Sequence, residues 1–444
     1  MDHGEAIIPN PWMMLPFGLL LAMIALGPLF FLHWWEKHYP KVAYVLGAIT
    51  LGYYLFGLHA YHTVTHTAIE YVSFIALVGS LYVVSGGIHI TVKGEATPFN
   101  NVVFLLVGAI LANVLGTTGA SMLMIRPWIR MNKYRITAHH IVFFIFIVSN
   151  VGGCLTPIGD PPLFLGFLKG IPFWWVLEKC WPMWLAGIGI LLTMFYVVDK
   201  INYRKAPKEV REEIAEPPDE WQFNGLINLV FLGVILVAVF ISTPLFLREA
   251  LMVAAAVASY KITKEQIHRA NQFNFHPIQE VAILFIGIFC TMMPALDWLK
   301  SNASAMQQTS PSIFYWGTGL LSGVLDNAPT YLSFLSAIMG KFANPEVVAD
   351  ALNVNAAGLT EAQQINFLLQ DPSLAQYIVA ISVAAVFFGA NTYIGNGPNF
   401  MVKSIADQQK VNAPTFLGYV FKFTIPYRVS VLHNLSHLFN QLHF

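Results

Sequence analysis

Long apolar stretches alternate with short polar stretches along most of the chain. Many of the apolar stretches approach or exceed the ~20 residues that an α-helix needs to cross the hydrocarbon core of a bilayer. The pattern therefore predicts an all-α polytopic membrane protein with about ten crossings. We place the crossings at residues 13–32, 42–58, 70–91, 137–170, 172–198, 224–243, 248–260, 278–297, 374–408 and 412–432.

Two further apolar segments, 101–131 and 312–340, are each interrupted in the middle. The sequence GTTG at 116–119 divides the first segment, and DNAP at 326–329 divides the second. Neither half of either segment is long enough to cross a bilayer. We predict that each segment forms a re-entrant helical hairpin whose tip lies near the middle of the membrane.

Two of the predicted crossings contain breaks rich in Gly, Pro and Asn. The first reads SNVGGCLTPIGDPP at 149–162, and the second reads NTYIGNGPN at 391–399. A helix does not continue through such sequences, and the freed backbone groups must be satisfied by protein or by a watery cavity, because lipid offers no partners. Matching breaks in two halves of a chain are typical of a transporter binding site. The residues expected to break the backbone are Gly152, Gly153, Pro157, Gly159, Gly395 and Gly397.

The charges in the loops predict how the chain crosses the membrane. Basic residues favour the cytoplasmic side, and they cluster at 126–135, 199–222 and 261–269, whereas the connection 341–373 is mainly acidic. The three basic clusters lie on one side of the membrane, and the acidic connection on the other, only if both hairpins turn back. The first hairpin then enters from the cytoplasm and the second from outside, with both chain termini outside, so the two repeats are inverted.

The repeat predicts the organisation of the chain. VLGTT at 114–118 aligns with VLDNA at 324–328, and each hairpin is followed by a broken crossing. We therefore divide the chain into N-terminal scaffold helices at 1–69, a first repeat at 70–200 with its hairpin at about 101–131 and broken helix at about 137–170, a linker with central helices at 201–277, and a second repeat at 278–444 with its hairpin at about 312–340 and broken helix at about 374–408.

Composition agrees with a membrane protein and excludes other classes. The 444 residues are 56% hydrophobic and 11% charged, and 24 basic residues balance 24 acidic ones, so no basic face for nucleic acid is predicted. The three cysteines are widely spaced in apolar sequence, which indicates neither a disulfide framework nor a zinc site. The first apolar run lacks a basic flank and a cleavage site, and we interpret it as a retained helix.

Asp160 and Asp326 are the two acids within the predicted breaks, and inverted symmetry should turn both towards a common centre. A carboxylate at membrane depth is costly unless it is paired, protonated or bound to an ion. One alternative is that Asp160 caps the short helix beginning at Pro161, and another is that neighbouring amides satisfy Asp326. The predicted ion- and proton-binding residues are Asp160, Asp326, Asn150, Thr156, Asn327, Asn391, Thr392 and Asn396, with Thr117 and Thr118 as hairpin-tip contacts.

The breaks themselves contain no Lys or Arg. A site with two carboxylates and no basic residue is negative when empty and should attract a cation. We therefore expect sodium as the transported or coupling ion, with no other cofactor or metal. His59, His62 and His66 share roughly one helical face, but Glu70 is the only additional ligand type nearby, so a functional metal is not expected there.

These motifs resemble the ion transporter superfamily, close to the NhaD-type sodium/proton antiporters and the citrate-transport proteins grouped near them. The resemblance rests on residues 111–127, 149–173, 269–293, 323–329 and 389–403. It implies two inverted repeats, a scaffold that mediates homodimerisation, a mobile transport domain with elevator-like alternating access, and a bacterial inner membrane. It also implies that Asp160 and Asp326 handle ions and protons. The sequence departs from the better characterised antiporters at 161–164, where PPLF replaces Thr-rich sequence.

The sequence thus favours a sodium/proton antiporter, with the lipid bilayer, sodium and protons as its partners. The alternative is a sodium-coupled transporter of a small di- or tricarboxylate, which would place helix N-termini and Asn/Thr groups around the anion. An intramembrane aspartyl protease also needs two acids, but it requires GxGD on one helix, whereas here Asp160 follows PIG and Asp326 lies in LDN. We therefore expect no enzyme. A channel is disfavoured because hairpins of opposite entry are the design of alternating access.

Overall fold

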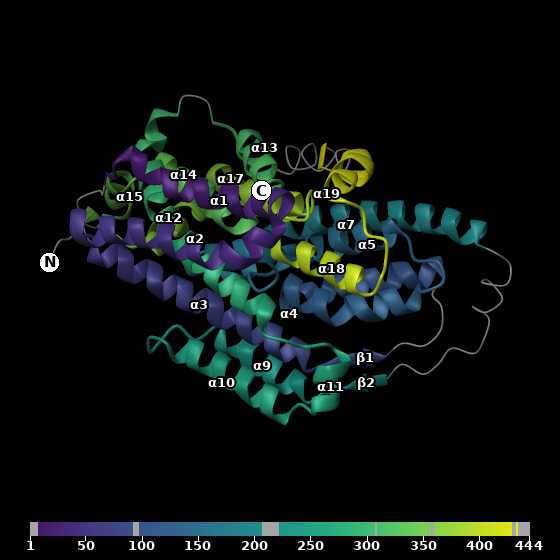
Figure 1. The fold of residues 1–444 in the computed structure, drawn as a ribbon. Coiled ribbons are helices and arrows are strands. Elements are labelled where there is room, and N and C mark those ends of the chain that lie inside the picture. Colours follow the sequence, from purple (N-terminus) through teal and green to yellow (C-terminus); the bar gives the residue numbers. More distant parts are fainter. Residues whose placement is uncertain are drawn as a thin grey trace.

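A computed structural model describes residues 8–91, 97–206, 222–306, 309–353, 355–356, 359–428 and 432–433. Nearly all regular structure in these residues is helical, and seven of the described helices are long and apolar enough to cross a membrane (Figure 1). The predicted all-α polytopic class is confirmed. The sequence predicted about ten crossings rather than seven because that number also counts broken and shorter helices. Residues 207–221 of the predicted linker region lie outside the described residues.

One set of helices, which we call the scaffold group, packs together through close helix contacts. Phe74 stacks on Phe285 with ring centroids 4.6 Å apart, and Tyr54 donates a hydrogen bond of 2.7 Å to Asp297. Gly287 lies against Ala43 so closely that a Cβ at Gly287 would be 3.0 Å from the Ala43 Cα. The scaffold group consists of α1 (Leu15–Phe30), α2 (Leu32–Gly52), α3 (Tyr61–Gly86), α9 (Asn228–Ala238), α10 (Leu247–Ile262) and α12 (His276–Asn302).

Two of these helices extend beyond their apolar stretches. The helix α2 begins at Leu32 rather than near residue 42, and α3 begins at Tyr61 rather than near residue 70. A helix satisfies its own backbone hydrogen bonds whatever its side chains are, so it can continue past the apolar window that defines a crossing.

The other set, which we call the core group, contains the interrupted elements. The first hairpin is α4, which turns back at Gly116, where φ is 72° and only glycine is unstrained. Its two legs lie side by side, since Phe104 stacks on Trp128 with centroids 5.6 Å apart. The core group consists of α4 (Pro98–Met131), α5 (Ala138–Ile147), η3 (Val151–Leu155), α6 (Pro161–Leu168), α7 (Phe173–Lys205), α13 (Pro311–Ser322), α14 (Asn327–Phe342), α17 (Pro372–Gly389) and α18 (Gly397–Gln408).

The second hairpin is formed by α13 and α14, whose legs meet where Phe314 packs on Phe334 at 5.9 Å. The helices α5 and α6 are the two parts of the first broken crossing, and α17 and α18 are the parts of the second. Both hairpins and both broken crossings therefore end inside the same body of the protein.

The third crossing, predicted near 70–91, is present as α3, but it ends at Gly86 rather than near residue 91. The side chain of Asn271 donates hydrogen bonds of 2.8 Å to the carbonyls of Gly86 and Ile88 and so holds the chain out of the helix. Residues 89–91 form β1, which pairs antiparallel with β2. The remaining elements are η1 (Pro11–Met14), η2 (Tyr53–Gly57), β1 (His89–Thr91), β2 (Gln222–Asn224), α11 (Glu265–Ala270), η4 (Ala303–Ala305), α15 (Pro345–Leu352), α16 (Glu361–Gln370), α19 (Phe416–Tyr419) and η6 (Val420–Arg428).

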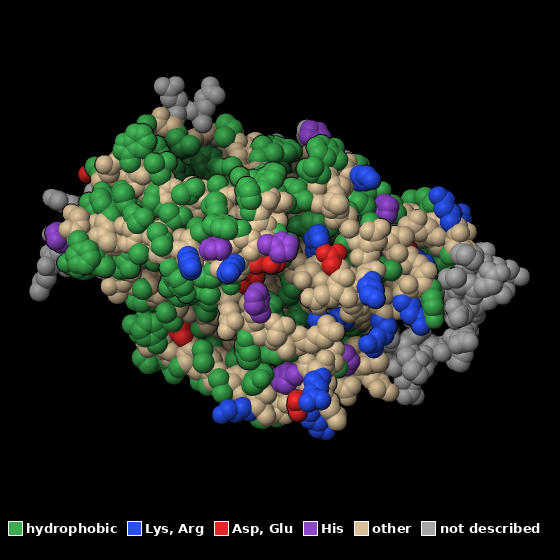
Figure 2. All heavy atoms as spheres, viewed as in Figure 1, with side chains coloured by type: hydrophobic (Ala, Val, Ile, Leu, Met, Phe, Trp, Pro, Cys, Tyr) green, Lys and Arg blue, Asp and Glu red, His purple; other side chains and the backbone are tan. Residues whose placement is uncertain are grey.

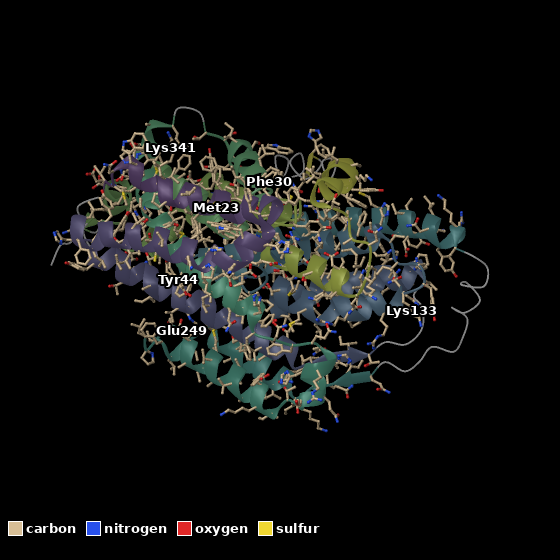
Figure 3. The ribbon with its side chains drawn as sticks, viewed as in Figure 1. Met23, Phe30, Tyr44, Lys133, Glu249 and Lys341 are labelled. Atoms are coloured by element: carbon tan, nitrogen blue, oxygen red, sulfur yellow. The ribbon has the colours of Figure 1, made fainter. Side chains whose placement is uncertain are left out.

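The charged loops gather at two ends of the molecule. The base of the first hairpin, the end of α7 and the β1–β2 ribbon lie at one end, where Lys133 is found, whereas Lys341 lies at the opposite end (Figure 3). Hydrophobic side chains cover much of the left and upper part of the view in Figure 2, whereas charged and histidine side chains lie across its middle and right. Which end faces the cytoplasm stays a prediction.

Candidate functional site

Asp160 lies where all four interrupted elements meet. Its carboxylate accepts hydrogen bonds from Thr117 Oγ1 at 2.7 Å, from Asn396 Nδ2 at 2.9 Å and from Asn327 Nδ2 at 2.6 Å. Thr117 follows the turn of the first hairpin, Asn327 starts the inner leg of the second, and Asn396 belongs to the second break. The side chain is buried, with 1% of its residue surface exposed. One carboxylate therefore joins both hairpins and both breaks.

Local sequence explains why Asp160 is free to make these contacts. It occupies the residue before α6, which starts at Pro161, a residue suited to the first helical turn because it needs no N–H partner. The Asp160 side chain makes no capping hydrogen bond to this helix. Thr117 N donates to Gly159 O at 2.8 Å, and a Cβ at Gly159 would overlap the carbonyl oxygen of Gly153. The glycines thus permit the tight turn that turns Asp160 inwards.

Asp326 behaves differently from Asp160. It precedes α14, and its Oδ1 accepts a hydrogen bond from Ala328 N at 3.0 Å, which is the contact of a helix N-cap. The residue that reaches Asp160 from this hairpin is the next one, Asn327. The Asn327 Oδ1 is buried and has no hydrogen-bond partner among the described residues. It is therefore available to a cation or to a protonated carboxyl group.

Three asparagines connect the two breaks to each other. Asn150 Nδ2 donates to Asn399 Oδ1 at 2.6 Å, and Asn396 Nδ2 donates to Asn150 Oδ1 at 3.2 Å. Asn399 also donates to the carbonyls of Gly389 and Thr392, at 2.8 and 2.9 Å, where α17 ends and the second break begins. It fixes the broken backbone and links it to the first break, although the sequence analysis assigned it no role.

Asn113 plays the equivalent part in the first repeat, and it was also missed. Its side chain donates to Gly152 O at 2.7 Å and accepts from Leu155 N at 2.9 Å, so it holds the two ends of η3. The hydroxyl of Thr156 donates to Asn113 O at 2.6 Å. Thr156, predicted as an ion ligand, is therefore directed at backbone. The available signal for Asn113 and Asn399 was a polar amide within or beside an otherwise apolar segment.

Two more predicted ligands are also engaged with backbone or side chains beside the second break. The Thr392 hydroxyl accepts hydrogen bonds from Ile394 N and Gly395 N, at 3.2 and 3.1 Å, and so shapes the turn. Asn391 Oδ1 faces Arg428. Thr118 is half-buried next to Thr117, but the described contacts of Asp160 use Thr117.

Arg428 is a basic residue that lies beside the second break, although the breaks themselves contain no Lys or Arg. Its guanidinium is fully buried at the C-terminal end of α17, where it donates to the carbonyl of Phe387 and, through Nε, to Asn391 Oδ1 at 3.4 Å. It also lies 5.0 Å from the ring centroid of Phe146. Arg428 Nη1 has no partner among the described residues. Arg428, 37 residues after Asn391, thus places a cation beside the second break.

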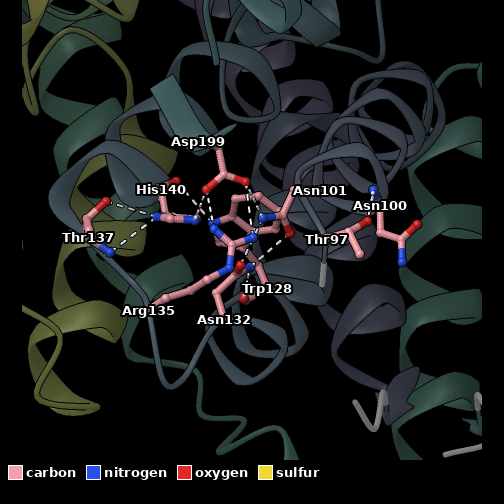
Figure 4. Close-up of polar contacts among 9 residues, drawn as sticks. All are labelled: Thr97, Asn100, Asn101, Trp128, Asn132, Arg135, Thr137, His140 and Asp199. Atoms are coloured by element: carbon pink, nitrogen blue, oxygen red, sulfur yellow. Dashed lines mark hydrogen bonds and ion pairs between the residues drawn. The ribbon is translucent and has the colours of Figure 1, made fainter. Parts of the chain in front are cut away.

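A second polar cluster fixes the base of the first hairpin (Figure 4). Asp199 of α7 forms two contacts with Arg135 and accepts a hydrogen bond of 2.8 Å from Asn101. His140 Nε2 lies 3.1 Å from Asp199, while its Nδ1 accepts from Thr137 N at 3.2 Å, so Nε2 carries the proton. These contacts anchor the hairpin and the start of α5 to α7.

Within the part of the chain that the structure describes, one group of histidine and acidic side chains has the spacing of a metal site. His66, Glu70 and Glu361 have ligand atoms within 4.8 Å of one another. However, the ammonium group of Lys169 already lies 2.7 Å from Glu70 and 2.9 Å from Glu361, so the place of a cation is taken by a side chain. All three cysteines are free.

Interrupted hairpins and broken helices that meet at one buried carboxylate, within a polytopic all-α protein, define the class of membrane transporters. The family described as Putative citrate transport matches residues 7–440, and the chain belongs to this family. No curated protein matches the sequence. The match supports transport rather than catalysis and fits the predicted superfamily, but it does not distinguish the NhaD-type antiporters from the citrate-type carriers.

Proposed function

We propose that the protein is a secondary active transporter that exchanges sodium for protons at Asp160. The observation that carries this proposal is the position of Asp160, whose described hydrogen-bond partners are all neutral donors at the junction of the four interrupted elements. A buried carboxylate without a cationic partner is costly, and binding of either a proton or a sodium ion removes that cost.

Competition for one carboxylate accounts for exchange. Sodium prefers oxygen ligands, and Asp160 together with the unpaired Asn327 Oδ1 supplies them at one point. Each bound ion lowers the affinity for the other, and exchange follows if the core group moves only when Asp160 is neutralised. Apparent sodium affinity then improves as pH rises, because fewer protons compete.

The proposal also covers how the core group moves and how two copies of the protein assemble. The core group would move against the scaffold group in an elevator-like manner, and the scaffold group would mediate a homodimer in a bacterial inner membrane. The basic end, with Lys133, would face the cytoplasm.

The test is transport in proteoliposomes loaded with acid and a pH-sensitive dye. Sodium, lithium, potassium and choline are added in turn outside, and we expect sodium to cause dequenching that choline does not cause. The matched control is Asp160→Asn, which keeps the shape of the side chain but removes its charge. Equal dequenching in wild type and Asp160→Asn would overturn the role of Asp160.

A second candidate function is sodium-coupled uptake of a small carboxylate such as citrate. Arg428 favours it, because an unpaired guanidinium nitrogen beside the second break is a donor suited to a carboxylate, and the family description names citrate. Here Asp160 would bind the coupling sodium ion, and Arg428 would contribute to anion binding.

Uptake of labelled citrate and succinate, with and without sodium, separates the two candidates. Sodium-dependent citrate uptake in wild type that Arg428→Gln abolishes, together with no sodium-driven proton movement between about pH 6 and 9, would establish the second candidate. Sodium-driven proton movement without labelled uptake would establish the first.

A further inference from the structure

Four charged side chains form a continuous chain of ion pairs between the scaffold group and the core group. Lys300 of α12 pairs with Glu361 of α16, Glu361 pairs with Lys169 at 2.9 Å, and Lys169 pairs with Glu70 of α3 at 2.7 Å. Lys300 and Glu70 belong to the scaffold group. Lys169 directly follows α6, and α16 lies in the connection between the second hairpin and α17. The pair Lys169–Glu70 therefore links the end of α6 to the scaffold group, and the pair Lys300–Glu361 links α16 to it.

These pairs are not ordinary surface ion pairs. The side chains of Glu70 and Lys169 are only 8% and 12% exposed, so removing one partner leaves a charge in poorly solvated surroundings. Burial alone would raise the pKa of Glu361, but Lys300 and Lys169 outweigh it and hold that pKa well below its usual range. Glu361 is thus ionised at neutral pH and stays paired with both lysines.

The helix α6 connects these ion pairs to the candidate site. It starts after Asp160 and ends before Lys169, and its 8 residues span about 12 Å. At its far end, Gly170 lies directly against Ala362 of α16, where a Cβ at Gly170 would be 2.6 Å from the Ala362 Cα. A short, tightly packed helix transmits displacement from one end to the other.

We propose that Lys300, Glu361, Lys169 and Glu70 form a conformational latch that holds the core group against the scaffold group at this end and opens when the two groups move apart. The proposal rests on the proposed function only in requiring that the groups move. Lys169 is a positioning residue, since it holds α6 and thereby Asp160 without contacting the transported ion. The neighbouring groups are His66, 3.5 Å from Glu70, and Asp297, held by Tyr54.

The test measures the distance between spin labels at His62→Cys on α3 and Ala362→Cys on α16, both exposed positions outside the latch, in a background with Cys154, Cys180 and Cys290 replaced by Ala. In nanodiscs, we expect one main short distance. Lys169→Met should enlarge the population at longer distance by about tenfold, as expected for losing largely buried pairs, and Lys169→Arg should restore the short distance.

The control pair is Val347→Cys on α15 with Ala362→Cys on α16, whose distance Lys169→Met should not change because both sites lie in the same connection. An unchanged distribution between positions 62 and 362 in a folded, monodisperse Lys169→Met protein would overturn the latch. The measurement needs no transport. A change in distance in a protein without sodium-driven proton movement would therefore support the latch and contradict the proposed exchange, whereas exchange without a change in distance would do the reverse.

Discussion

Asn327 donates its side-chain amide to Asp160 over 2.6 Å, although the two residues are separated by 167 positions in the chain. This bond couples the tip of the second hairpin to the first broken helix. An ionised Asp160 accepts from the Asn327 nitrogen, whereas a protonated Asp160 can donate to the Asn327 oxygen after the amide turns over. Protonation of Asp160 therefore changes a contact between the two repeats.

Replacing Asp160 with Asn should abolish coupled exchange while leaving the protein folded. Neutralising a buried carboxylate removes a desolvation cost, so we expect no loss of thermal stability in detergent. Fluorescence-detected gel filtration after heating measures stability, and dye dequenching in proteoliposomes measures exchange. A marked fall in stability would show that Asp160 is chiefly a structural residue.

Asp326 is expected to act mainly as a helix cap. Asn caps a helix about as well as Asp, so Asp326→Asn should keep both fold and exchange, whereas Asp326→Ala should lose about 1 kcal/mol of stability. Thermal unfolding and transport are measured for both variants. Loss of exchange in a stable Asp326→Asn protein would instead assign Asp326 to ion binding.

Removing the charge of Asp199 should destabilise the protein strongly. Asp199→Asn leaves the buried guanidinium of Arg135 without its carboxylate, a change that costs roughly 3–5 kcal/mol. The control is Glu265→Gln, which removes an exposed pair with Arg269 and should cost less than about 1 kcal/mol. Denaturation in detergent compares the two, and equal effects would contradict the role of the cluster in Figure 4.

The orientation in the membrane can be measured by cysteine labelling in intact cells. Cysteines at Arg130 and Lys205 should react only with reagents that cross the membrane, and a cysteine at Asn355 should react with impermeant reagents. A cysteine-free background supplies the control. Strong labelling of position 130 from outside would invert the proposed orientation.

Lowering the pH should reduce the stability of the folded protein, because Glu361 becomes protonated and its ion pairs are lost. Its pKa in the folded protein is held below that of the unfolded chain, about 4.3, so the ion pairs contribute stability above that pH and lose it as pH falls towards the folded value. Glu361→Gln should be less stable than wild type at pH 7, and the difference should shrink as pH falls below about 4. Melting temperatures across this range test it, and a constant difference would exclude this linkage.

Much of the architecture was readable from the sequence because its signals are local. A run of apolar residues specifies a crossing, and Gly and Pro within such a run specify a break, whatever the rest of the chain does. The sequence therefore located 149–162 and 391–399, the turn at Gly116, and Asp160 as an acid on irregular backbone. The limits of α2 and α3 were less well predicted, because helices continue into polar sequence.

Only the tertiary structure decided which residues meet at the site. Asp160 contacts Asn396 and Asn327, Asn150 reaches Asn399, and Arg428 returns to the end of α17. Helices that are apolar on all sides carry no pattern that shows which face turns inwards. Their rotation is set by packing, as at Gly287 against Ala43, so the partners of Asp160 and the cation near the second break follow from the fold and not from spacing.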